Sequence, residues 1–217
     1  MSLQPLVLFG AGGHALEVAQ IVHDINAVAP RWQLLGTLVD TAYLPGADGA
    51  DPMLPVLGDT RWIDRHGDVQ VLVAIGDPAV RQRVVRDLLS RQAGLRFATL
   101  IHPRAWIAAG SEPGEGSVVF AGALVNIDTR IGAHAIVNLG CTISHGCRIG
   151  DFVSLGPGAC LPGRVLVGDL ADLGAGCIAR PRARIGAGAV LGAGAVAVED
   201  MPDGCVAVGV PARPVSA

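Results

Sequence analysis

Aromatic residues are scarce in this chain, although it is apolar overall. Phe, Trp and Tyr make up 4% of the 217 residues, whereas hydrophobic residues make up 51%. The apolar content is therefore mainly Ala, Val, Leu and Ile. Such a composition excludes a core built around large rings and suits a repetitive core of small and branched side chains.

Runs of positive charge and long hydrophobic runs are also missing. The formal net charge is −3 and there is no basic run, so we expect no nucleic-acid partner. The apolar segment from Leu6 to Phe9 is too short for a signal sequence or a membrane span. We therefore expect a cytoplasmic protein without membrane insertion. The lack of a Gly-x-Ser-x-Gly motif disfavours a covalent acyl-enzyme.

What the chain does contain is a six-residue repeat that keeps its register from Val119 to Ala197. Of the fourteen residues at this spacing, twelve are Ile, Leu or Val and two are Ala. A smaller residue follows four positions after each of them, except at Met201. Neither a helix nor a simple strand has this period, and a short period kept over many copies is typical of a parallel β-helix.

Three hexads are expected to form one triangular coil of eighteen residues, with successive coils about 4.8 Å apart. The hexads begin near Ile107 and become regular at Val119. Glycine often follows the large apolar residue, where we expect a tight corner that would exclude a side chain or require a positive φ. These glycines are Gly132, Gly150, Gly156, Gly168, Gly174, Gly186 and Gly192.

Three of the five cysteines, Cys141, Cys147 and Cys177, occupy the small inward position of a hexad. Their spacings match no zinc signature. We therefore expect buried structural thiols and no metal site.

The first part of the chain has a different pattern. We expect strands over 6–9, 34–39 and 69–75, helices over 15–27 and 79–92, and a loop over 41–55 that is rich in Pro, Gly and Asp. Strands that alternate with helices indicate a small parallel α/β sheet. The sequence thus predicts a Rossmann-like domain over residues 1–101 and a β-helix over residues 102–217. On the first helix, we expect Leu16, Ala19, Ile21 or Val22, and Ile25 on one side.

A glycine-rich turn, Gly10 to Gly13, lies between the first strand and the first helix. Backbone N–H groups at such a turn can hold phosphate. The match to GxGxxG is imperfect because Ala15 takes the third glycine's place, and a simple tight turn is the alternative. Asp40 ends the second strand, where a Rossmann domain contacts ribose. NAD is one interpretation, but the few strands favour a single nucleotide.

His145 falls at the third position of its hexad, which points outward when positions one and five point inward. It is either a solvated surface residue or a base that reaches a substrate between neighbouring β-helices. His134 has a similar context at another position, and His23 and His66 are expected at the surface.

Together these residues resemble the sialic-acid O-acetyltransferase-like family of hexapeptide acyltransferases, in its branch of N-acetyltransferases for nucleotide-linked 4-amino sugars. The resemblance rests on FGAGGHALEV at 9–18, AIGD at 74–77, IHP at 101–103, NLGCTISHGCRIGD at 138–151 and GVPAR at 209–213. It covers nearly the whole chain. It implies a left-handed β-helix, a homotrimer, and acetyl-CoA bound between adjacent β-helices, with the nucleotide held by the N-terminal domain.

The resemblance also implies roles for single residues. His145 matches the catalytic base, and Asn138 matches an asparagine near the reacting amine. His14 matches a histidine that reaches toward a neighbouring subunit's site, and the N–H of Gly163 lies near the thioester carbonyl. The remaining candidates are Gly10, Gly12, Gly13, Asp40, Gly76 and Arg81 for the nucleotide sugar, with Ser154 and Gly174 for acetyl-CoA.

Two positions depart from the family's pattern. The family has Asp or Glu directly after the catalytic histidine, where this chain has Gly146, and often a second histidine where it has Ser154. A carboxylate beside an imidazole fixes its tautomer and stabilises the imidazolium. Asp128 lies eighteen residues before Gly146, one coil away. We therefore hypothesise that the Asp128 carboxylate replaces the missing one.

The sequence thus predicts an acetyl-CoA-dependent N-acetyltransferase that acts directly on the amine of a nucleotide-linked sugar of the 4-amino-4,6-dideoxy type. One alternative is an O-acetyltransferase for a sugar hydroxyl such as that of sialic acid. Another is a catalytically silent trimeric scaffold that binds a nucleotide sugar, which Gly146 and Ser154 favour. Neither the nucleotide (UDP, dTDP or GDP) nor the sugar is specified by the sequence.

Overall fold

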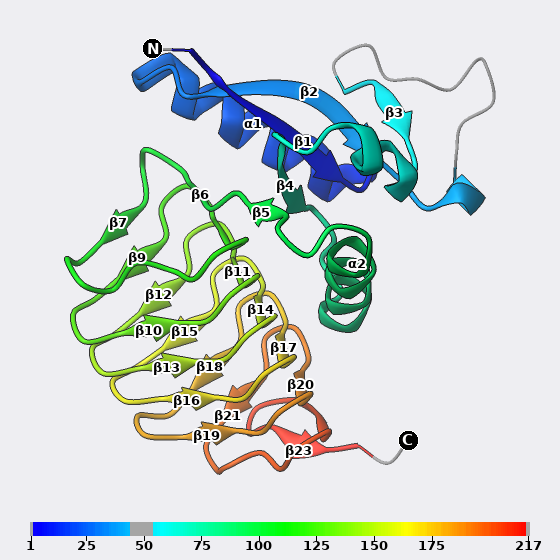
Figure 1. Cartoon of the computed structure of the whole chain (residues 1–217). Coiled ribbons are helices and arrows are strands. Elements are labelled where there is room, and N and C mark those ends of the chain that lie inside the picture. Colours follow the sequence, from blue (N-terminus) through cyan, green and yellow to red (C-terminus); the bar gives the residue numbers. More distant parts are fainter. Residues whose placement is uncertain (1, 44–53, 216–217) are drawn as a thin grey trace. The chain divides into compact units, whose positions relative to one another are not determined.

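The computed structural model describes residues 2–43 and 54–215. The chain divides into two compact units, one formed by Met1–Gly76 and Val80–Pro103, the other by Asp77–Ala79 and Arg104–Ala217. The first unit is a small α/β domain and the second is a left-handed parallel β-helix (Figure 1). This is the fold class that the sequence predicts.

The first unit contains a five-stranded parallel sheet in the order β3-β2-β1-β4-β5. The strands are β1 (Gln4–Phe9), β2 (Trp32–Leu38), β3 (Val56–Gly58), β4 (Gln70–Val73) and β5 (Arg96–Phe97). Helix α1 (Gly13–Val28) follows β1, and α2 (Pro78–Arg91) follows β4. The apolar run of β1 is fully buried because this strand lies at the centre of the sheet.

Helix α1 buries only part of the side that the sequence predicted: Ile21 and Val22 are buried as expected, but Leu16 is not. Its buried residues are Ala15, Val18, Ile21 and Val22, whereas Leu16 is 42% exposed. The helix carries two adjacent apolar stripes, and the sheet packs against the one that contains the smaller Ala15. Ala15 takes the place of the third glycine of the dinucleotide motif, where a small residue allows the helix to pack closely on the strand. This explains why the stripe that contains Ala15 faces the sheet.

Two short strands, β3 and β5, and the 3₁₀ helix η2 (Thr60–Arg65) were not expected from the sequence. Of the loop predicted over 41–55, residues 41–43 form the 3₁₀ turn η1 (Thr41–Tyr43). Residues 44–53 of that predicted loop lie outside the described residues.

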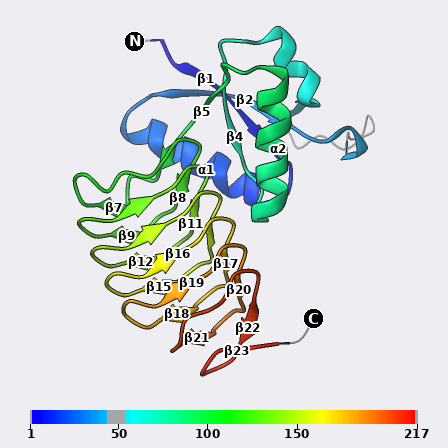
Figure 2. The ribbon, with the colours of Figure 1, turned by 60° about the horizontal axis from the view of Figure 1, so that its bottom comes forward.

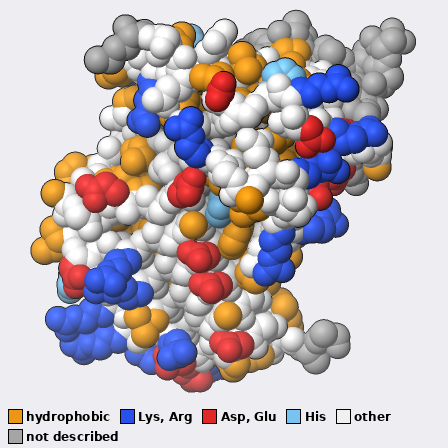
Figure 3. Space-filling view, in the orientation of Figure 1, with side chains coloured by type: hydrophobic (Ala, Val, Ile, Leu, Met, Phe, Trp, Pro, Cys, Tyr) orange, Lys and Arg blue, Asp and Glu red, His pale blue; other side chains and the backbone are white. Residues whose placement is uncertain are grey.

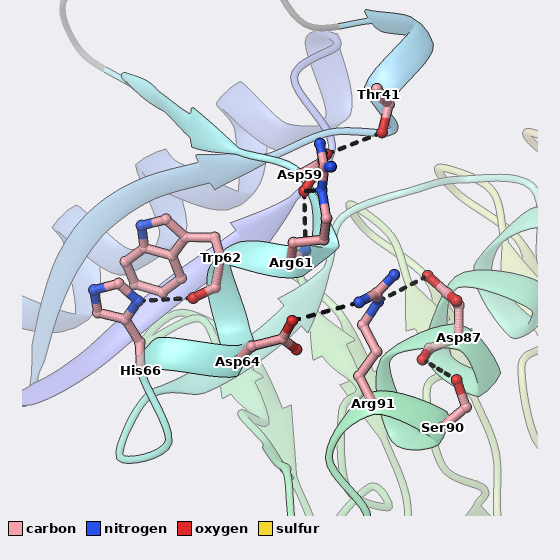
Figure 4. A network of polar contacts seen from close by, with 9 residues as sticks. All are labelled: Thr41, Asp59, Arg61, Trp62, Asp64, His66, Asp87, Ser90 and Arg91. Atoms are coloured by element: carbon pink, nitrogen blue, oxygen red, sulfur yellow. Dashed lines mark hydrogen bonds and ion pairs between the residues drawn. The ribbon is translucent and has the colours of Figure 1, made fainter.

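A polar network fixes η2 (Figure 4). The Asp59 carboxylate accepts a hydrogen bond from the backbone N–H of Arg61 at 2.9 Å and caps the helix. The Arg61 guanidinium donates to the same carboxylate and holds the pKa of Asp59 well below its usual range. Thr41 donates to Asp59 at 3.0 Å, and the rings of Trp62 and His66 stack 3.6 Å apart. The capping therefore explains why this segment is ordered without a long apolar run.

The second unit is built mainly from two-residue strands that form three sheets along the coils, all parallel except for the last strand (Figure 2). We call the first sheet the apolar face. It comprises β7 (Trp106–Ile107), β9 (Leu124–Val125), β12 (Thr142–Ile143), β15 (Cys160–Leu161), β18 (Ile178–Ala179) and β21 (Val196–Ala197). Its outward side chains are Trp106, Leu124, Thr142, Cys160, Ile178 and Val196. Most of them are apolar, and an apolar face open to solvent marks a surface for a partner.

We call the second sheet the basic face. It comprises β10 (Arg130–Ile131), β13 (Arg148–Ile149), β16 (Leu166–Val167) and β19 (Arg184–Ile185). The third sheet contains β8 (Val118–Val119), β11 (Ile136–Val137), β14 (Ser154–Leu155), β17 (Asp172–Leu173), β20 (Val190–Leu191), β22 (Val206–Val208) and β23 (Arg213–Pro214).

The hexad register explains the core. Strands pair with a shift of eighteen residues, as in Arg130 with Arg148 and Thr142 with Cys160. Every inward residue from Val119 to Ala197 is at most 5% exposed, and so is each smaller residue four positions later. The shift shortens to sixteen residues where Val190 pairs with Val206, and the antiparallel strand β23 then closes the sheet.

The seven corner glycines are required for steric reasons. A Cβ on any of them would lie closer than 3.0 Å to an atom of the adjacent coil. None of the seven has a positive φ. Positive φ values occur two positions later in the corner, as at Gly158 (70°) and Gly176 (67°). We expected these glycines either because a side chain would clash or because φ must be positive. The clash with the adjacent coil is confirmed as the reason, and the positive φ is not.

The inward cysteines are buried, as predicted. Desolvation raises the pKa of Cys141 to about 11 and that of Cys177 to about 12, and it also raises the pKa of Cys147. These thiols are therefore inert packing groups at neutral pH. Within residues 2–43 and 54–215, no helix is both long enough and apolar enough to cross a bilayer.

Candidate active site

His145 lies on an exposed corner that we call the histidine corner, where the apolar face turns into the basic face. Its imidazole lies against Gly163 of the next coil. A Cβ on Gly163 would stand 2.7 Å from Cε1 and 2.8 Å from Nε2 of His145. Only glycine therefore leaves room for the ring in this position.

The backbone N–H of Gly163 donates no hydrogen bond to any described residue. Its carbonyl accepts from the N–H of Arg182 at 3.0 Å, which fixes the peptide in the coil. An exposed imidazole and a free, rigidly held N–H thus lie side by side. This pair can remove a proton and stabilise a developing oxyanion.

The structure predicts that Gly163→Ala lowers kcat by about tenfold or more, because a displaced base loses its alignment with the reacting atoms. The KM for the acyl donor should change less than kcat, and thermal unfolding should show a folded protein. The matched control is Gly94→Ala, because a Cβ there would meet no atom within 4 Å and because Gly94, like Gly163, has no positive φ. Equal losses in both variants would assign the effect to the backbone and not to His145.

Asp128 lies one coil before Gly146, as expected. Its Oδ2 is 3.7 Å from the position that a Cβ on Gly146 would take. However, its carboxylate forms an ion pair with Arg148 at 2.8 Å, and Arg148 also donates to the backbone carbonyl of Asp128. No hydrogen bond joins it to His145 among the described residues. The expected replacement of the missing carboxylate is therefore not formed, because a long arginine on the basic face holds the group instead.

Asn138 and Gly174 lie on another corner, which we call the asparagine corner. This corner connects the third sheet to the apolar face. The side-chain oxygen of Asn138 accepts from the N–H of Leu139 at 2.7 Å, which orients the amide. Ser154 is 7% exposed and lies on the third sheet. One chain therefore does not gather its own His145, Asn138 and Ser154 into one site.

The α/β unit contains a hollow of about 490 Å³ at the carboxyl ends of β1, β2 and β4. Gly10, Gly12, Asp40 and Arg83 line it, together with apolar side chains. Gly10 has a φ of 120°, and a Cβ there would lie 2.8 Å from the carbonyl oxygen of Ala74. The turn can thus exist only with glycine, and its backbone forms one wall of the hollow.

Asp40 and Arg83 face each other across this hollow at 3.7 Å, and both remain partly exposed. Arg83 was not singled out from the sequence because an arginine on a solvated helix carries no motif. Carboxyl ends of parallel strands are where open α/β sheets bind their ligands. The hollow therefore offers a carboxylate, a guanidinium and a glycine turn to one ligand.

The other N-terminal candidates do not line this hollow. Arg81 is buried, and its guanidinium donates to the carbonyls of Ile75 at 2.6 Å and of Gly76 at 2.9 Å. It holds the loop after β4. Gly13 and His14 form the first turn of α1. Burial lowers the pKa of His14, and the charge of Arg81 lowers it further, whereas Glu17 opposes the shift.

No group of three or more His, Cys, Asp or Glu side chains that could hold a metal ion occurs in the part of the chain that the structure describes. The histidine corner places an exposed imidazole beside a free backbone N–H. Together with a hexapeptide β-helix, these features define an acyltransferase.

Comparison with known proteins narrows this class. The model of the family described as "PglD N-terminal domain" matches residues 5–88 of this chain. The acetyltransferase domain of PglB from Neisseria gonorrhoeae superposes with a TM-score of 0.86 at 30% identity, covering 98% of this chain and 100% of that chain. PerB from Caulobacter crescentus, in complex with CoA and GDP-perosamine, gives 0.85 at 34% identity and covers 99% of both chains. WeeI from Acinetobacter baumannii gives 0.84 at 27% identity, covering 97% of this chain and 99% of its own.

No curated relative matches at the sequence level. The solved structures of the PglB acetyltransferase domain and of PerB nevertheless cover 98% and 99% of this chain, at 30% and 34% sequence identity. The chain therefore belongs to the family of hexapeptide-repeat sugar N-acetyltransferases that includes PerB and the PglB acetyltransferase domain.

Proposed function

We propose that this protein transfers an acetyl group from acetyl-CoA to the amine of a nucleotide-linked sugar of the 4-amino-4,6-dideoxy type. The observation that carries the proposal is the packing of the His145 ring on Gly163 at an exposed corner. The PglB acetyltransferase domain has been solved with acetyl coenzyme A, and PerB with CoA and GDP-perosamine, which supports these ligands here.

The amine nitrogen attacks the thioester carbonyl carbon and forms the new C–N bond. His145 takes the proton that the nitrogen loses, as a general base. The carbonyl oxygen gains negative charge, which the N–H of Gly163 stabilises. The C–S bond then breaks, and the sulfur of CoA leaves and takes up a proton. Asp128 has no part in this step because Arg148 holds its carboxylate.

We propose that the active unit is a homotrimer with the apolar faces turned toward its threefold axis. Trp106, Leu124 and Ile178 on this face are 53%, 47% and 41% exposed. Ile127, Leu139 and Val198 extend the apolar surface onto the corners on either side. A surface of this kind on one side of a rigid prism is suited to a closed ring of copies.

This arrangement unites residues that a single chain keeps apart. The histidine corner and the asparagine corner border the two edges of the apolar face. When three such faces surround an axis, the histidine corner of one copy lies beside the asparagine corner of the next. Acetyl-CoA then lies between neighbouring β-helices, with His145 and Gly163 from one copy and Asn138 and Gly174 from the other. In this account Asn138 positions the amine.

The hollow of the α/β unit is proposed to hold the nucleotide of the sugar substrate. The N–H groups of Ala11, Gly12 and Gly13 would face a phosphate, whereas that of Gly10 donates to the carbonyl of Leu38 at 2.8 Å. Asp40 would accept from a ribose hydroxyl, as a carboxylate at the end of a second strand does in this type of sheet. Arg83 would bind a further oxygen of the same ligand, Arg81 and Gly76 support the loop, and His14 points toward the neighbouring copy's site.

Release of free thiol from acetyl-CoA tests the proposal when 4-amino sugars linked to GDP, UDP and dTDP are compared with the matching 4-hydroxy sugars. We expect rapid release with one amino sugar nucleotide and background rates with every hydroxy sugar. Faster release with a hydroxy sugar or with sialic acid would favour O-acetylation. Tight binding of the nucleotide sugar without any thiol release would favour a silent scaffold. Either result would contradict the proposal.

A further inference from the structure

We infer that Thr129 and Cys147, two buried side chains of the β-helix, are positioning residues for the histidine corner. Cys147 holds the peptide group whose N–H is the proposed oxyanion donor, and Thr129 holds the peptide group that carries the proposed base. The inference rests on the proposed function and adds two residues that no motif identifies. Neither of them reaches the substrate, because both point into the core of the coils.

Cys147 fixes the corner that contains Gly163. Its thiol donates to the carbonyl oxygen of Pro162 at 3.2 Å, and the backbone N–H of Val165 hydrogen-bonds to the same sulfur. One side chain thus ties the backbone on both sides of Gly163. Because a trans peptide group is planar, its C=O and N–H point in opposite directions. A Pro162 carbonyl held in the core therefore directs the N–H of Gly163 outward, toward the proposed thioester.

The hydrogen bond from Cys147 also affects the strength of this donor. When a carbonyl accepts a hydrogen bond, the N–H of the same peptide group becomes a stronger donor, because bonds in a chain polarise one another. Cys147 therefore both directs and strengthens the N–H that stabilises the developing oxyanion.

Thr129 acts in the same way one coil earlier. Its hydroxyl donates to the carbonyl oxygen of Ser144 at 3.1 Å, and this carbonyl belongs to the peptide group whose nitrogen is that of His145. Thr129 is itself held by Ser111, whose hydroxyl accepts from the N–H of Thr129 at 3.2 Å. The backbone from which the imidazole projects is therefore anchored in the core.

Both hydrogen bonds are shielded from solvent. Figure 3 shows acidic and basic side chains over the left-hand edge of the lower coils, whereas Thr129 and Cys147 are only 1% and 0% exposed. Water does not compete for such bonds, which are stronger in a medium of low dielectric constant. Burial raises the pKa of the Cys147 thiol, so that the group keeps its proton at neutral pH and remains a donor.

The coil itself does not require a donor at these positions. The equivalent inward residues of the next two coils are Val165 and Ala183, which are fully buried and carry no polar side-chain atom. An apolar residue avoids the cost of burying a hydroxyl or a thiol. The row of inward donors that begins at Ser111 ends with Cys147, the residue that reaches the corner of Gly163.

The first test compares kcat of Cys147→Ala and Cys147→Ser with that of the full-length wild type at saturating substrates. Alanine removes the donor and should lower kcat about fivefold, which is part of the hundred- to thousandfold that one oxyanion donor contributes. Serine restores a donor of similar size and should bring kcat back to within about twofold of the wild type, with KM for acetyl-CoA unchanged in both variants.

Cys141→Ala is the matched control for this effect. Its thiol makes the same contact, to the carbonyl of Gly156 at 3.2 Å, but the next residue there is Pro157, which has no N–H to direct. Both alanine variants lose a buried thiol, so their thermal midpoints should fall alike, whereas only Cys147→Ala should lose kcat. Equal losses of kcat in the two variants would assign the effect to packing and overturn the inference.

Thr129→Val tests the second positioning residue, since valine keeps the branched shape and removes the hydroxyl. We expect kcat to fall about fivefold because the base loses its alignment, and Thr129→Ser should recover it. Ser117→Ala is the control, because it removes a hydroxyl that holds the carbonyl of Gly132 at a corner without a proposed catalytic group. Unchanged kcat in Thr129→Val would overturn the role of Thr129.

Infrared spectroscopy of acetyl-CoA labelled with ¹³C at its carbonyl measures the oxyanion donor without turnover. Binding to the wild type should lower the carbonyl stretching frequency. This shift should shrink in Cys147→Ala, return in Cys147→Ser and stay intact in Thr129→Val, which acts on the base alone. An equal shift and equal kcat in the wild type and Cys147→Ala would overturn the role of Cys147 alone. A wild-type protein that neither shifts the carbonyl nor turns over would overturn the proposed function itself.

Discussion

Replacing His145 with alanine is expected to lower kcat by about a hundred- to ten-thousand-fold, because the reacting amine loses its proton acceptor. Affinity for acetyl-CoA should stay within about threefold of the wild type, since the groups proposed to hold CoA lie on later coils. The exposed position of His145 means that the fold should not depend on it. Single-turnover kinetics at saturating substrates measure the effect on the chemical step.

The control for this variant is His23→Ala, which removes an exposed imidazole from α1. It should leave kcat unchanged. Turnover of His145→Ala within about threefold of the wild type would remove His145 from the mechanism, because general-base catalysis is worth far more than that. The thioester would then be attacked without base assistance, and the packing on Gly163 would be purely structural.

The second large effect is expected when two inactive variants are mixed. In the proposed trimer, each site takes His145 from one copy and Asn138 from the next. An intact site therefore forms wherever an Asn138→Ala copy supplies its wild-type His145 and the next copy, a His145→Ala variant, supplies its wild-type Asn138. Random assembly of equal amounts gives about a quarter of the sites intact, since each of the two required wild-type residues is present half of the time.

Co-expression of the two variants with different affinity tags, followed by two-step purification, measures this recovery. Each variant alone should have only residual activity, and the purified mixed trimers should regain about a third of the wild-type activity, since each of them contains one intact site out of three. Mixing two preparations that cannot exchange subunits is the control and should recover nothing. A mixed trimer with no more activity than its parents would show that each chain forms its own site.

The β-helix could be predicted almost completely from the sequence. A six-residue period fixes which side chains point inward, and stacking at eighteen residues follows from three sides per coil. Val119 and Leu155 therefore could be placed in the core without any tertiary information. The α/β unit was less predictable. β3 and β5 are short strands whose pairing depends on distant partners, and the buried side of α1 was decided by packing against the sheet.

The candidate site shows the same division. The register places Gly163 one coil after His145, and the structure packs the ring on it. The register also places Asp128 beside Gly146. It does not specify the rotamer of Arg148, and the Arg148 guanidinium forms an ion pair with the Asp128 carboxylate. Contacts made by long flexible side chains are decided by competition among neighbours, and no sequence period encodes them.

In the reaction proposed above, this protein forms an amide bond on a nucleotide-linked sugar. The most direct measurement is mass spectrometry of the nucleotide sugar after incubation with isotope-labelled acetyl-CoA, with and without hydroxylamine treatment. We expect a product that carries one labelled acetyl group and keeps it in hydroxylamine, because amides resist this reagent. Loss of the label in hydroxylamine would show an ester, and a nucleotide sugar that stays unlabelled at every enzyme concentration would contradict acetyl transfer altogether.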